Sequence, residues 1–181
     1  MGAIESHPPV PEPQTHRPIA PLYTEAERIR RDSTPWTLVQ GLLAPVQFLV
    51  FLVSLVLVLR YLSTGVGESA ATVSIVIKTL LLYTVMVTGA IWEKHVFGVY
   101  LFARPFFWED VFSMLVLALH TAYLVALATG AMSSRALMLL ALAAYATYVI
   151  NAAQFVLKLR AARLQAARSA VNGLSASGAA S

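Results

Sequence analysis

The chain has 181 residues, of which 58% are hydrophobic and only 12% are charged, and its mean hydropathy is +0.70. A composition this apolar excludes an ordinary soluble domain and indicates a protein that faces lipid. The absence of cysteine excludes disulfides, iron–sulfur clusters and thiolate chemistry. The net charge of +4 comes from cations at the chain ends and in one loop rather than from a basic stripe, so we expect no nucleic acid among the partners.

The chain begins with a segment unlike the rest. Residues 1–22 are polar and proline-rich, without the apolar run of a signal peptide, and we predict a disordered leader there. A short surface helix follows, since Thr24 and Glu27 have the spacing of a capping box.

Four stretches then stay apolar for the ~20 residues that a helix needs to cross ~30 Å of hydrocarbon. They are 36–62, 71–92, 110–131 and 135–157. We therefore predict a transmembrane domain over residues 23–164, followed by a disordered Ala/Ser/Gly-rich tail over residues 165–181.

These spans predict an all-α integral membrane protein, because a helix satisfies its own backbone hydrogen bonds in lipid. The short connections within the first and second pairs of spans favour an antiparallel four-helix bundle. Lys and Arg gather at one set of span ends, namely Arg28, Arg30, Arg31, Lys94, Arg104, Lys158, Arg160, Arg163 and Arg168. The opposite ends carry Arg60 and Arg135. The positive-inside rule therefore predicts that both termini and the loop over residues 93–109 are cytoplasmic, in a multi-pass protein.

Polar side chains repeat along one face of each span and lie mostly toward the cytoplasmic ends. Asn151 and Gln154 belong to this set in the fourth span, where interhelical hydrogen bonding is the alternative to a binding site. Lys78 lies deep in the second span, and two interpretations stay open. Its ammonium group reaches outward to the membrane surface, or it is a buried functional amine.

The segment over residues 91–112, IWEKHVFGVYLFARPFFWEDVF, combines carboxylates, a histidine, a lysine, an arginine and many aromatic residues at one membrane face. Interfacial anchoring explains the aromatic and basic side chains taken singly. It does not explain the acids, because carboxylates beside an anionic leaflet gain nothing and lose hydration. The acids are Glu93, Glu109 and Asp110.

Four runs in the chain resemble one known family. They are DSTPWTLVQGLLAPVQFLVFLVS, IVIKTLLLYTVMVTGAIWEK, LFARPFFWEDVFSMLVLALHTAYL and AAYATYVINAAQFVLKLRAARL. Over roughly residues 22–164 the chain closely resembles the 2-vinyl bacteriochlorophyllide hydratase family of bacteriochlorophyll biosynthesis. The resemblance implies a lyase that adds water to the C3 vinyl group of chlorophyllide a, or of 3-vinyl bacteriochlorophyllide a, giving a 3-(1-hydroxyethyl) group.

The resemblance also implies a location and partners. The location is the cytoplasmic membrane of a phototrophic bacterium, including its intracytoplasmic folds. The partners are the lipid bilayer, the chlorophyllide or bacteriochlorophyllide substrate, and other pigment-biosynthesis enzymes. Magnesium would arrive as part of the substrate, and we expect no cofactor and no resident metal site.

Hydration of a vinyl group needs an acid to protonate the terminal CH2 and a base to deprotonate the attacking water. Two partly buried carboxyls can supply both, because their proximity keeps one protonated while the other stays ionised. Glu93 ends the second span, and Glu109 and Asp110 open the third, so antiparallel packing can bring them together. We expect this cluster to be catalytic, with His95 as the alternative acid.

The implied substrate is a flat apolar ring with a propionate edge. Aromatic side chains would form walls and a cation would hold the carboxylate, although membrane anchoring is the alternative for each aromatic taken alone. The candidate binding residues are Trp92, Lys94, Arg104, Phe106, Trp108, Asn151, Gln154 and His120. His120 could bind the substrate magnesium axially, but it lies ~16 Å along the helix from Glu109, so an interhelical hydrogen bond is its default interpretation.

Other functions fit this sequence less well. A haem-binding bundle needs paired axial histidines, and only His120 lies within a span. A small carrier or proton channel would be expected to show broken helices or an internal repeat. The alternative that stays open is a non-catalytic tetrapyrrole-binding membrane scaffold for pigment–protein assembly.

Overall fold

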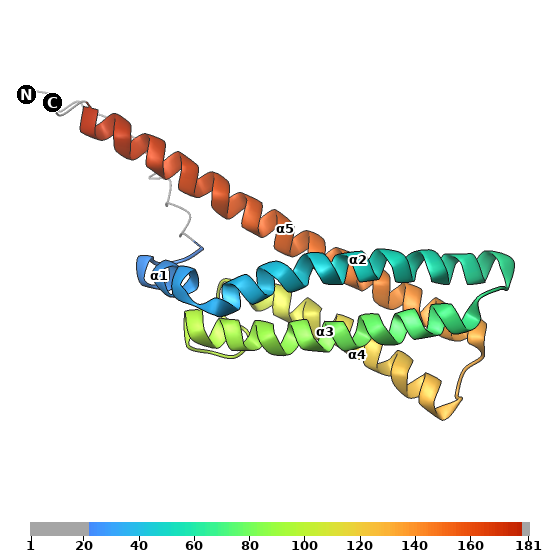
Figure 1. Cartoon of the computed structure of the whole chain (residues 1–181). Helices are drawn as coiled ribbons and strands as arrows, with labels where there is room; N and C mark the ends of the chain where they lie inside the picture. Colours follow the sequence, from blue (N-terminus) through green and yellow to red (C-terminus); the bar gives the residue numbers. More distant parts are fainter. Residues whose placement is uncertain (1–21, 179–181) are drawn as a thin grey trace, which may run out of the picture.

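The computed structural model describes residues 22–178, and these are helical apart from short connections. Five helices follow one another within these residues (Figure 1), namely α1 (Glu25–Ser33), α2 (Pro35–Thr64), α3 (Glu68–Phe97), α4 (Phe107–Thr129) and α5 (Ser134–Gly178). Within the described residues, four of them are long and apolar enough to cross a membrane, α5 over its part Ser134–Leu164. The predicted all-α class and the four long apolar helices are confirmed.

Each long helix begins before the apolar stretch from which it was predicted. Capping at the helix termini, and not hydropathy, decides where a helix begins and ends. α2 and α3 end at Gly65 and Gly98, which take left-handed conformations with φ of 71° and 83°. Glycine adopts this conformation without steric cost, and its N–H caps the last turn. α1 begins with the predicted capping box between Thr24 and Glu27.

α5 extends through Gly178 and so into the segment that composition predicts to be a disordered tail. The backbone of residues 165–178 is helical there because the segment is rich in alanine, which has the highest helix propensity. The predicted leader, up to residue 21, lies outside the described residues. The predicted domain boundaries stay predictions.

The packing of the long helices is uneven along their length. α2 packs along α3 and α4 packs along α5, with fewer contacts between these two pairs. A buried apolar core joins the pairs near the α2–α3 and α4–α5 connections, where Val58, Ile75, Tyr123 and Met138 have no exposed surface. At the opposite end α1 lies against α3, and side chains from both pairs line a cavity.

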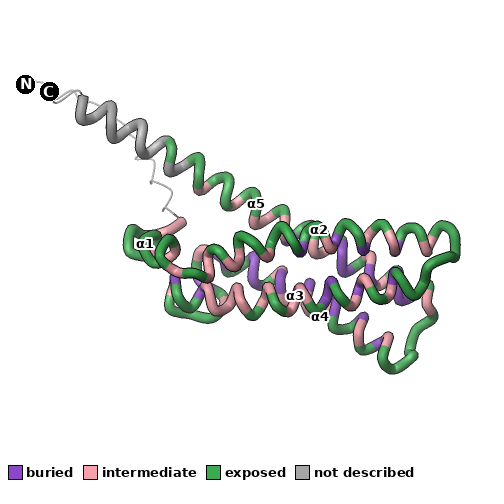
Figure 2. The backbone as a smooth tube through the Cα atoms, in the orientation of Figure 1, coloured by how far each residue is buried: buried purple, intermediate pink, exposed green. Residues whose placement is uncertain are grey.

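The outer surface of the long helices is apolar. Buried positions face the interior of the helix assembly, and exposed positions cover its outside (Figure 2). Val53, Val56 and Val87 are each more than 60% exposed, in the middle of their helices. Such an exterior is stable against lipid acyl chains rather than against water.

Lys78 is buried inside this assembly, with no exposed surface. Its Nζ lies 2.5 Å from His120 Nε2 and 4.3 Å from the centre of the Tyr148 ring. The structure therefore places the Lys78 amine in the interior rather than at the membrane surface. It also gives His120 the interhelical hydrogen bond that was its default interpretation.

Candidate active site

A cavity of about 1860 Å³ opens at the α1 end of the molecule. Its walls come from α1, the first halves of α2 and α4, the second half of α3 and the middle of α5. This volume exceeds the ~300–1,000 Å³ of ordinary small-molecule pockets, so the cavity has room for a large ligand. The lining is mostly apolar with a few polar groups, as is typical of sites for organic molecules.

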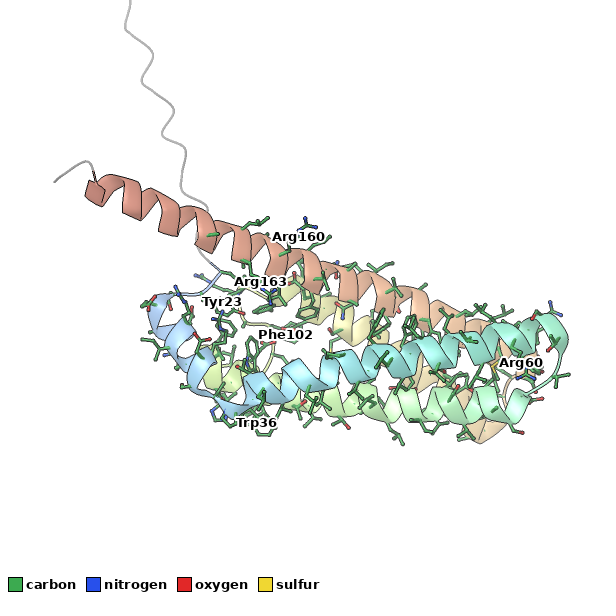
Figure 3. The ribbon with its side chains drawn as sticks, turned by 45° about the horizontal axis from the view of Figure 1, so that its top comes forward. Tyr23, Trp36, Arg60, Phe102, Arg160 and Arg163 are labelled. Carbon is green, nitrogen blue, oxygen red and sulfur yellow. The ribbon has the colours of Figure 1, made fainter. Side chains whose placement is uncertain are left out.

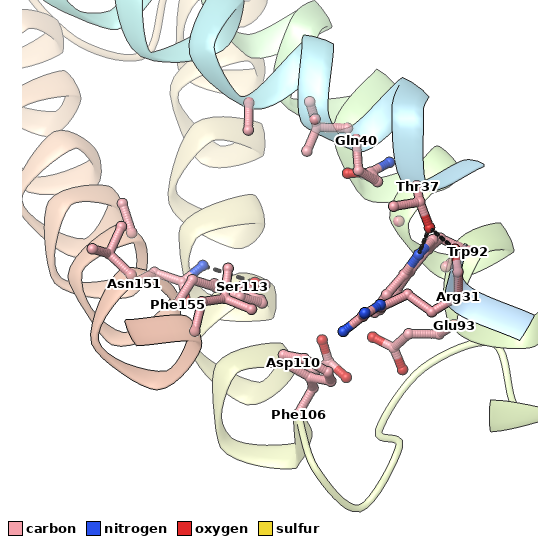
Figure 4. Close-up of a pocket in the computed structure, with 18 of the residues that line it drawn as sticks. Arg31, Thr37, Gln40, Trp92, Glu93, Phe106, Asp110, Ser113, Asn151 and Phe155 are labelled. Carbon is pink, nitrogen blue, oxygen red and sulfur yellow. Dashed lines mark hydrogen bonds between the residues drawn. The ribbon is translucent and has the colours of Figure 1, made fainter. Parts of the chain in front are cut away.

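Two of the predicted acids face each other in this cavity (Figure 4): Glu93 near the end of α3 and Asp110 in the first turn of α4. Both are buried, with 5% and 4% of their surface exposed, and their carboxyl groups point toward each other (Figure 4). Two facing carboxyls in a poorly hydrated site repel each other when both are ionised, which favours one protonated and one ionised group. Such a pair can hold an acid and a base side by side.

Backbone N–H groups of the α3–α4 loop orient both carboxyls. Phe102 N–H donates to Asp110 Oδ2 at 2.7 Å, and Ala103 N–H donates to Glu93 Oε2 at 3.2 Å. Phe102 has a φ of 60°, which is uncommon outside glycine. A left-handed residue in a turn lets neighbouring N–H groups converge on one anionic site. The loop thus fixes the two acids in relation to each other.

Anchoring a loop is a sufficient structural reason for one buried carboxyl. It does not explain two carboxyls that face each other, because the second adds desolvation and charge repulsion without being needed. Pairs of buried acids in a cavity are typical of acid–base sites. We therefore regard Glu93 and Asp110 as candidate acid–base groups. Their hydrogen bonds to the loop would orient them.

The other two predicted catalytic residues lie away from the cavity lining. Glu109 is adjacent to Asp110 but points toward α5, where it forms an ion pair with Lys158 Nζ at 2.6 Å. His95 is exposed, with its ring centre 6.5 Å from that of Trp36. The structure thus brings Glu93 and Asp110 together and separates Glu109 and His95 from them.

An aromatic cluster forms one wall of the cavity around Phe106, which is only 3% exposed. The Phe106 ring centre lies 5.8 Å from those of Trp92 and Phe155 and 6.4 Å from that of Tyr23, and all four residues line the cavity. The predicted wall residues Trp92 and Phe106 are therefore in position. Trp108 is not, because it is 68% exposed and lies outside the lining, as expected for a membrane anchor.

The two cations predicted to hold a carboxylate point elsewhere. Lys94 is exposed, and its Nζ donates to the Gly98 carbonyl at 2.8 Å. Arg104 is exposed as well. Neither side chain lines the cavity, so the sequence-based choice of cations is not supported.

Three arginines that the sequence assigned only to topology line the cavity instead: Arg28 and Arg31 of α1, and Arg163 of α5. Arg31 projects into the space shown in Figure 4, and its guanidinium carbon lies 4.7 Å from the centre of the Tyr23 ring. Burial raises the pKa of the Tyr23 phenol, although the nearby Arg31 charge opposes this. These three belong to the larger group of basic residues at one set of span ends, which the positive-inside rule already explains, and this is why the sequence did not single them out.

The other predicted binding residues also divide into those that line the cavity and those that do not. Asn151 lines the cavity, and its Nδ2 donates to Ser113 Oγ at 2.8 Å (Figure 4). Gln154 lies outside the lining. His120 is also outside it, with Nδ1 bonded to the Val116 carbonyl at 2.7 Å and Nε2 bonded to Lys78. Because both ring nitrogens are engaged, the structure gives no support to His120 as a magnesium ligand.

Four long apolar helices and a large cavity in which two buried carboxyls face each other are features of a polytopic membrane protein with a binding site for a large ligand. Comparison with known proteins narrows this class. The model of the 2-vinyl bacteriochlorophyllide hydratase family matches residues 23–161, and the chain therefore belongs to that family. The resemblance seen in the sequence is confirmed.

Two curated relatives are both named 2-vinyl bacteriochlorophyllide hydratase. The protein of Rhodobacter capsulatus is 73% identical over 146 residues, which are 81% of this chain and 85% of the relative. That of Cereibacter sphaeroides is 69% identical over 154 residues, which are 83% of this chain and 96% of the relative. No solved structure matches the chain.

Proposed function

We propose that this protein hydrates the C3 vinyl group of chlorophyllide a or 3-vinyl bacteriochlorophyllide a to a 3-(1-hydroxyethyl) group in bacteriochlorophyll biosynthesis. Family membership supports the reaction and the class of substrate. The observation that carries the mechanism is that Glu93 and Asp110 face each other inside a cavity large enough for a tetrapyrrole.

The reaction uses the two carboxyls as a pair. The protonated carboxyl donates its proton to the terminal vinyl carbon, and the π electrons form the new C–H bond. This leaves a cation on the inner vinyl carbon, conjugated with the macrocycle. The oxygen of water adds to that carbon, and the ionised carboxyl takes the proton that the water releases. A proton then passes from the second carboxyl back to the donor, so the cycle closes without net oxidation or reduction.

The cavity lining offers a contact for each part of the substrate. The rings of Phe106 and Trp92 suit a flat apolar macrocycle, since aromatic groups pack in offset-stacked or edge-to-face arrangements. Arg31 and Arg163 are the candidate partners of the propionate, in place of Lys94 and Arg104, because guanidinium groups bind carboxylates with two hydrogen bonds. Magnesium stays within the substrate. Hydration is redox-neutral, and the proposal requires no cofactor.

We propose further that the protein lies in the bacterial cytoplasmic membrane as an antiparallel bundle with both termini inside. Tyr23, Trp36 and Arg163 lie at one end of the long helices and Arg60 at the other (Figure 3), and the basic residues favour the first end, as the positive-inside rule requires of a cytoplasmic face.

Single cysteines at the exposed positions Ser33 and Ser63 test this orientation, since the chain has no other cysteine. A membrane-impermeant maleimide should label Ser63→Cys from outside intact cells and Ser33→Cys only after permeabilisation; the reverse pattern would contradict the orientation.

The activity is tested by supplying chlorophyllide a, without other cofactors, to membranes of a non-phototrophic host that contain the protein. We expect a pigment heavier by one water, with the spectrum of a macrocycle that has lost its vinyl conjugation. Binding of chlorophyllide a without conversion would contradict the proposal. It would favour the alternative of a tetrapyrrole-binding scaffold, for which the aromatic wall suffices.

A further inference from the structure

We infer that the cavity exchanges its pigment with the lipid bilayer through a lateral opening between α2 and α5. The inference rests on the proposed function for the identity of the ligand, and it adds the route by which that ligand reaches the acid pair.

α2 and α5 pack against each other at the level of Phe51. The ring centre of Phe51 lies 5.3 Å from that of Tyr145 and 5.0 Å from that of Tyr148, and Ser54 Oγ is hydrogen-bonded to Tyr145 Oη at 2.5 Å. From this level toward α1, α5 diverges from α2 (Figures 1 and 3). Residues of both helices beyond this level line the cavity. The two helices therefore separate where the cavity lies between them.

The walls of the cavity differ in their exposure. On α3 and α4, the lining residues Leu82 and Val116 are buried, with 4% and 1% of their surface exposed. On α2 and α5, Phe48, Val156 and Leu159 also line the cavity, and yet they are 46%, 64% and 41% exposed. A side chain that lines a cavity and is exposed at the same time lies at its edge. The cavity is therefore open on the side of α2 and α5.

Small residues keep this opening clear. Gly41 and Ala44 of α2 line the cavity and are exposed. A Cβ added at Gly41 would meet no atom of the described residues within 4 Å. A large side chain at either position would stand in the opening.

The composition of the edge indicates lipid as the neighbouring phase. The edge residues are apolar, and α2 has no charged residue between Trp36 and Arg60. The opening also lies within the parts of α2 and α5 that are apolar enough to cross a membrane. Such an opening faces acyl chains rather than water. A flat apolar ring in the bilayer can pass through it without first being transferred to water.

The position of Arg163 suits the same route. Arg163 lines the cavity one turn beyond Leu159, about 6 Å further along α5. The propionate of a pigment in the bilayer stays at the membrane surface, because a charge is costly in hydrocarbon. The pigment can therefore keep its carboxylate level with Arg163 while the ring moves between the helices. A route past the charged side chains of Glu25 and Arg28 would instead take the ring out of the lipid.

The first test measures uptake and release of chlorophyllide a by stopped-flow fluorescence, with the full-length protein in liposomes. The parent protein carries Asp110→Asn, so that bound pigment is not converted during the measurement. Gly41→Trp, which fills the opening, should slow uptake and release together by about 10-fold or more and leave Kd within about 2-fold. A narrowed passage slows both directions, whereas a damaged binding site speeds release.

Leu42→Trp is the matched control. Leu42 is the next residue of α2 and is 67% exposed, but it does not line the cavity. This variant should change neither rate. Ala44→Phe takes the place of Gly41→Trp if the latter does not accumulate, with the same expected result.

The second test needs no pigment. A spin label on Gly41→Cys or Leu42→Cys is the only one in the molecule, since the chain has no other cysteine. Oxygen, which dissolves in lipid, should broaden the spectrum of both labels more than a water-soluble nickel chelate does. Stronger broadening by nickel at Gly41→Cys would show an opening to water, and weak broadening by both would show that another chain covers it. Either result would contradict the inference.

The binding rates can overturn it as well. Uptake and release in Gly41→Trp as fast as in the parent would exclude this route. Faster release with weaker binding would mark Gly41 as a contact of the bound pigment instead. In these cases the proposed function would stand. A wild-type protein that binds chlorophyllide a without hydrating it would overturn the proposed function and leave the route, whereas one that binds no chlorophyllide a would overturn both.

Discussion

Glu109 and Asp110 are adjacent in the sequence, but successive residues of a helix project about 100° apart. Asp110 consequently faces the cavity and Glu93, whereas Glu109 faces α5 and Lys158. Both acids lie in the first turn of α4, where the helix dipole favours negative charge. The two acids therefore have different partners, and the sequence shows this difference only once the rotation of the helix is known.

We predict that Glu109→Gln keeps most of the hydration activity but lowers stability. The variant leaves the partly buried Lys158 without its partner, at a cost of about 1–2 kcal/mol, between the values for surface and buried ion pairs. The measurements are thermal unfolding in detergent and the initial rate of hydration, with Asp110→Asn as the matched variant. Loss of activity in Glu109→Gln as large as in Asp110→Asn would return Glu109 to the catalytic pair.

At the scale of the elements, the α3–α4 loop has the largest influence on the site, because two of its N–H groups orient the acids. We predict that Phe102→Val lowers the hydration rate by about 10-fold or more. A β-branched residue disfavours the left-handed conformation at φ 60°, and the loss of that turn would move the N–H away from Asp110.

Phe102→Gly is the control, since it also removes the ring but adopts the left-handed conformation freely. It should retain a rate close to that of the wild type. The measurement is the initial rate with equal amounts of folded protein. Equal rates for the Val and Gly variants would show that the conformation of Phe102 does not matter for the acids.

The helices themselves are largely predictable from the sequence, because lipid imposes both their length and their apolar exterior. Their ends are less so, since caps such as Gly98 and the alanine content of α5 act independently of hydropathy. The pairing of Glu93 with Asp110 could be predicted because one ends a span and the other opens the next. That Arg31 and Arg163 line the cavity could not be predicted, because the positive-inside rule already explains the basic residues at this set of span ends.

The molecule as a whole divides into two ends with different tasks. The end near the α2–α3 and α4–α5 connections has a closely packed core, whereas the α1 end holds the cavity, the acid pair and the aromatic wall. The core holds the helices together, and the cavity between the helix pairs leaves room for a large ligand.

The measurement that tests this account most directly is the initial rate of chlorophyllide a hydration by Glu93→Gln, Asp110→Asn and the double variant, at equal amounts of folded protein. The account predicts that each single change lowers the rate by about 100-fold or more, because each removes one half of the acid–base pair. It also predicts that the double variant is about as slow as the slower single one, since the two carboxyls act as a unit. Rates equal to that of the wild type in both single variants would contradict it.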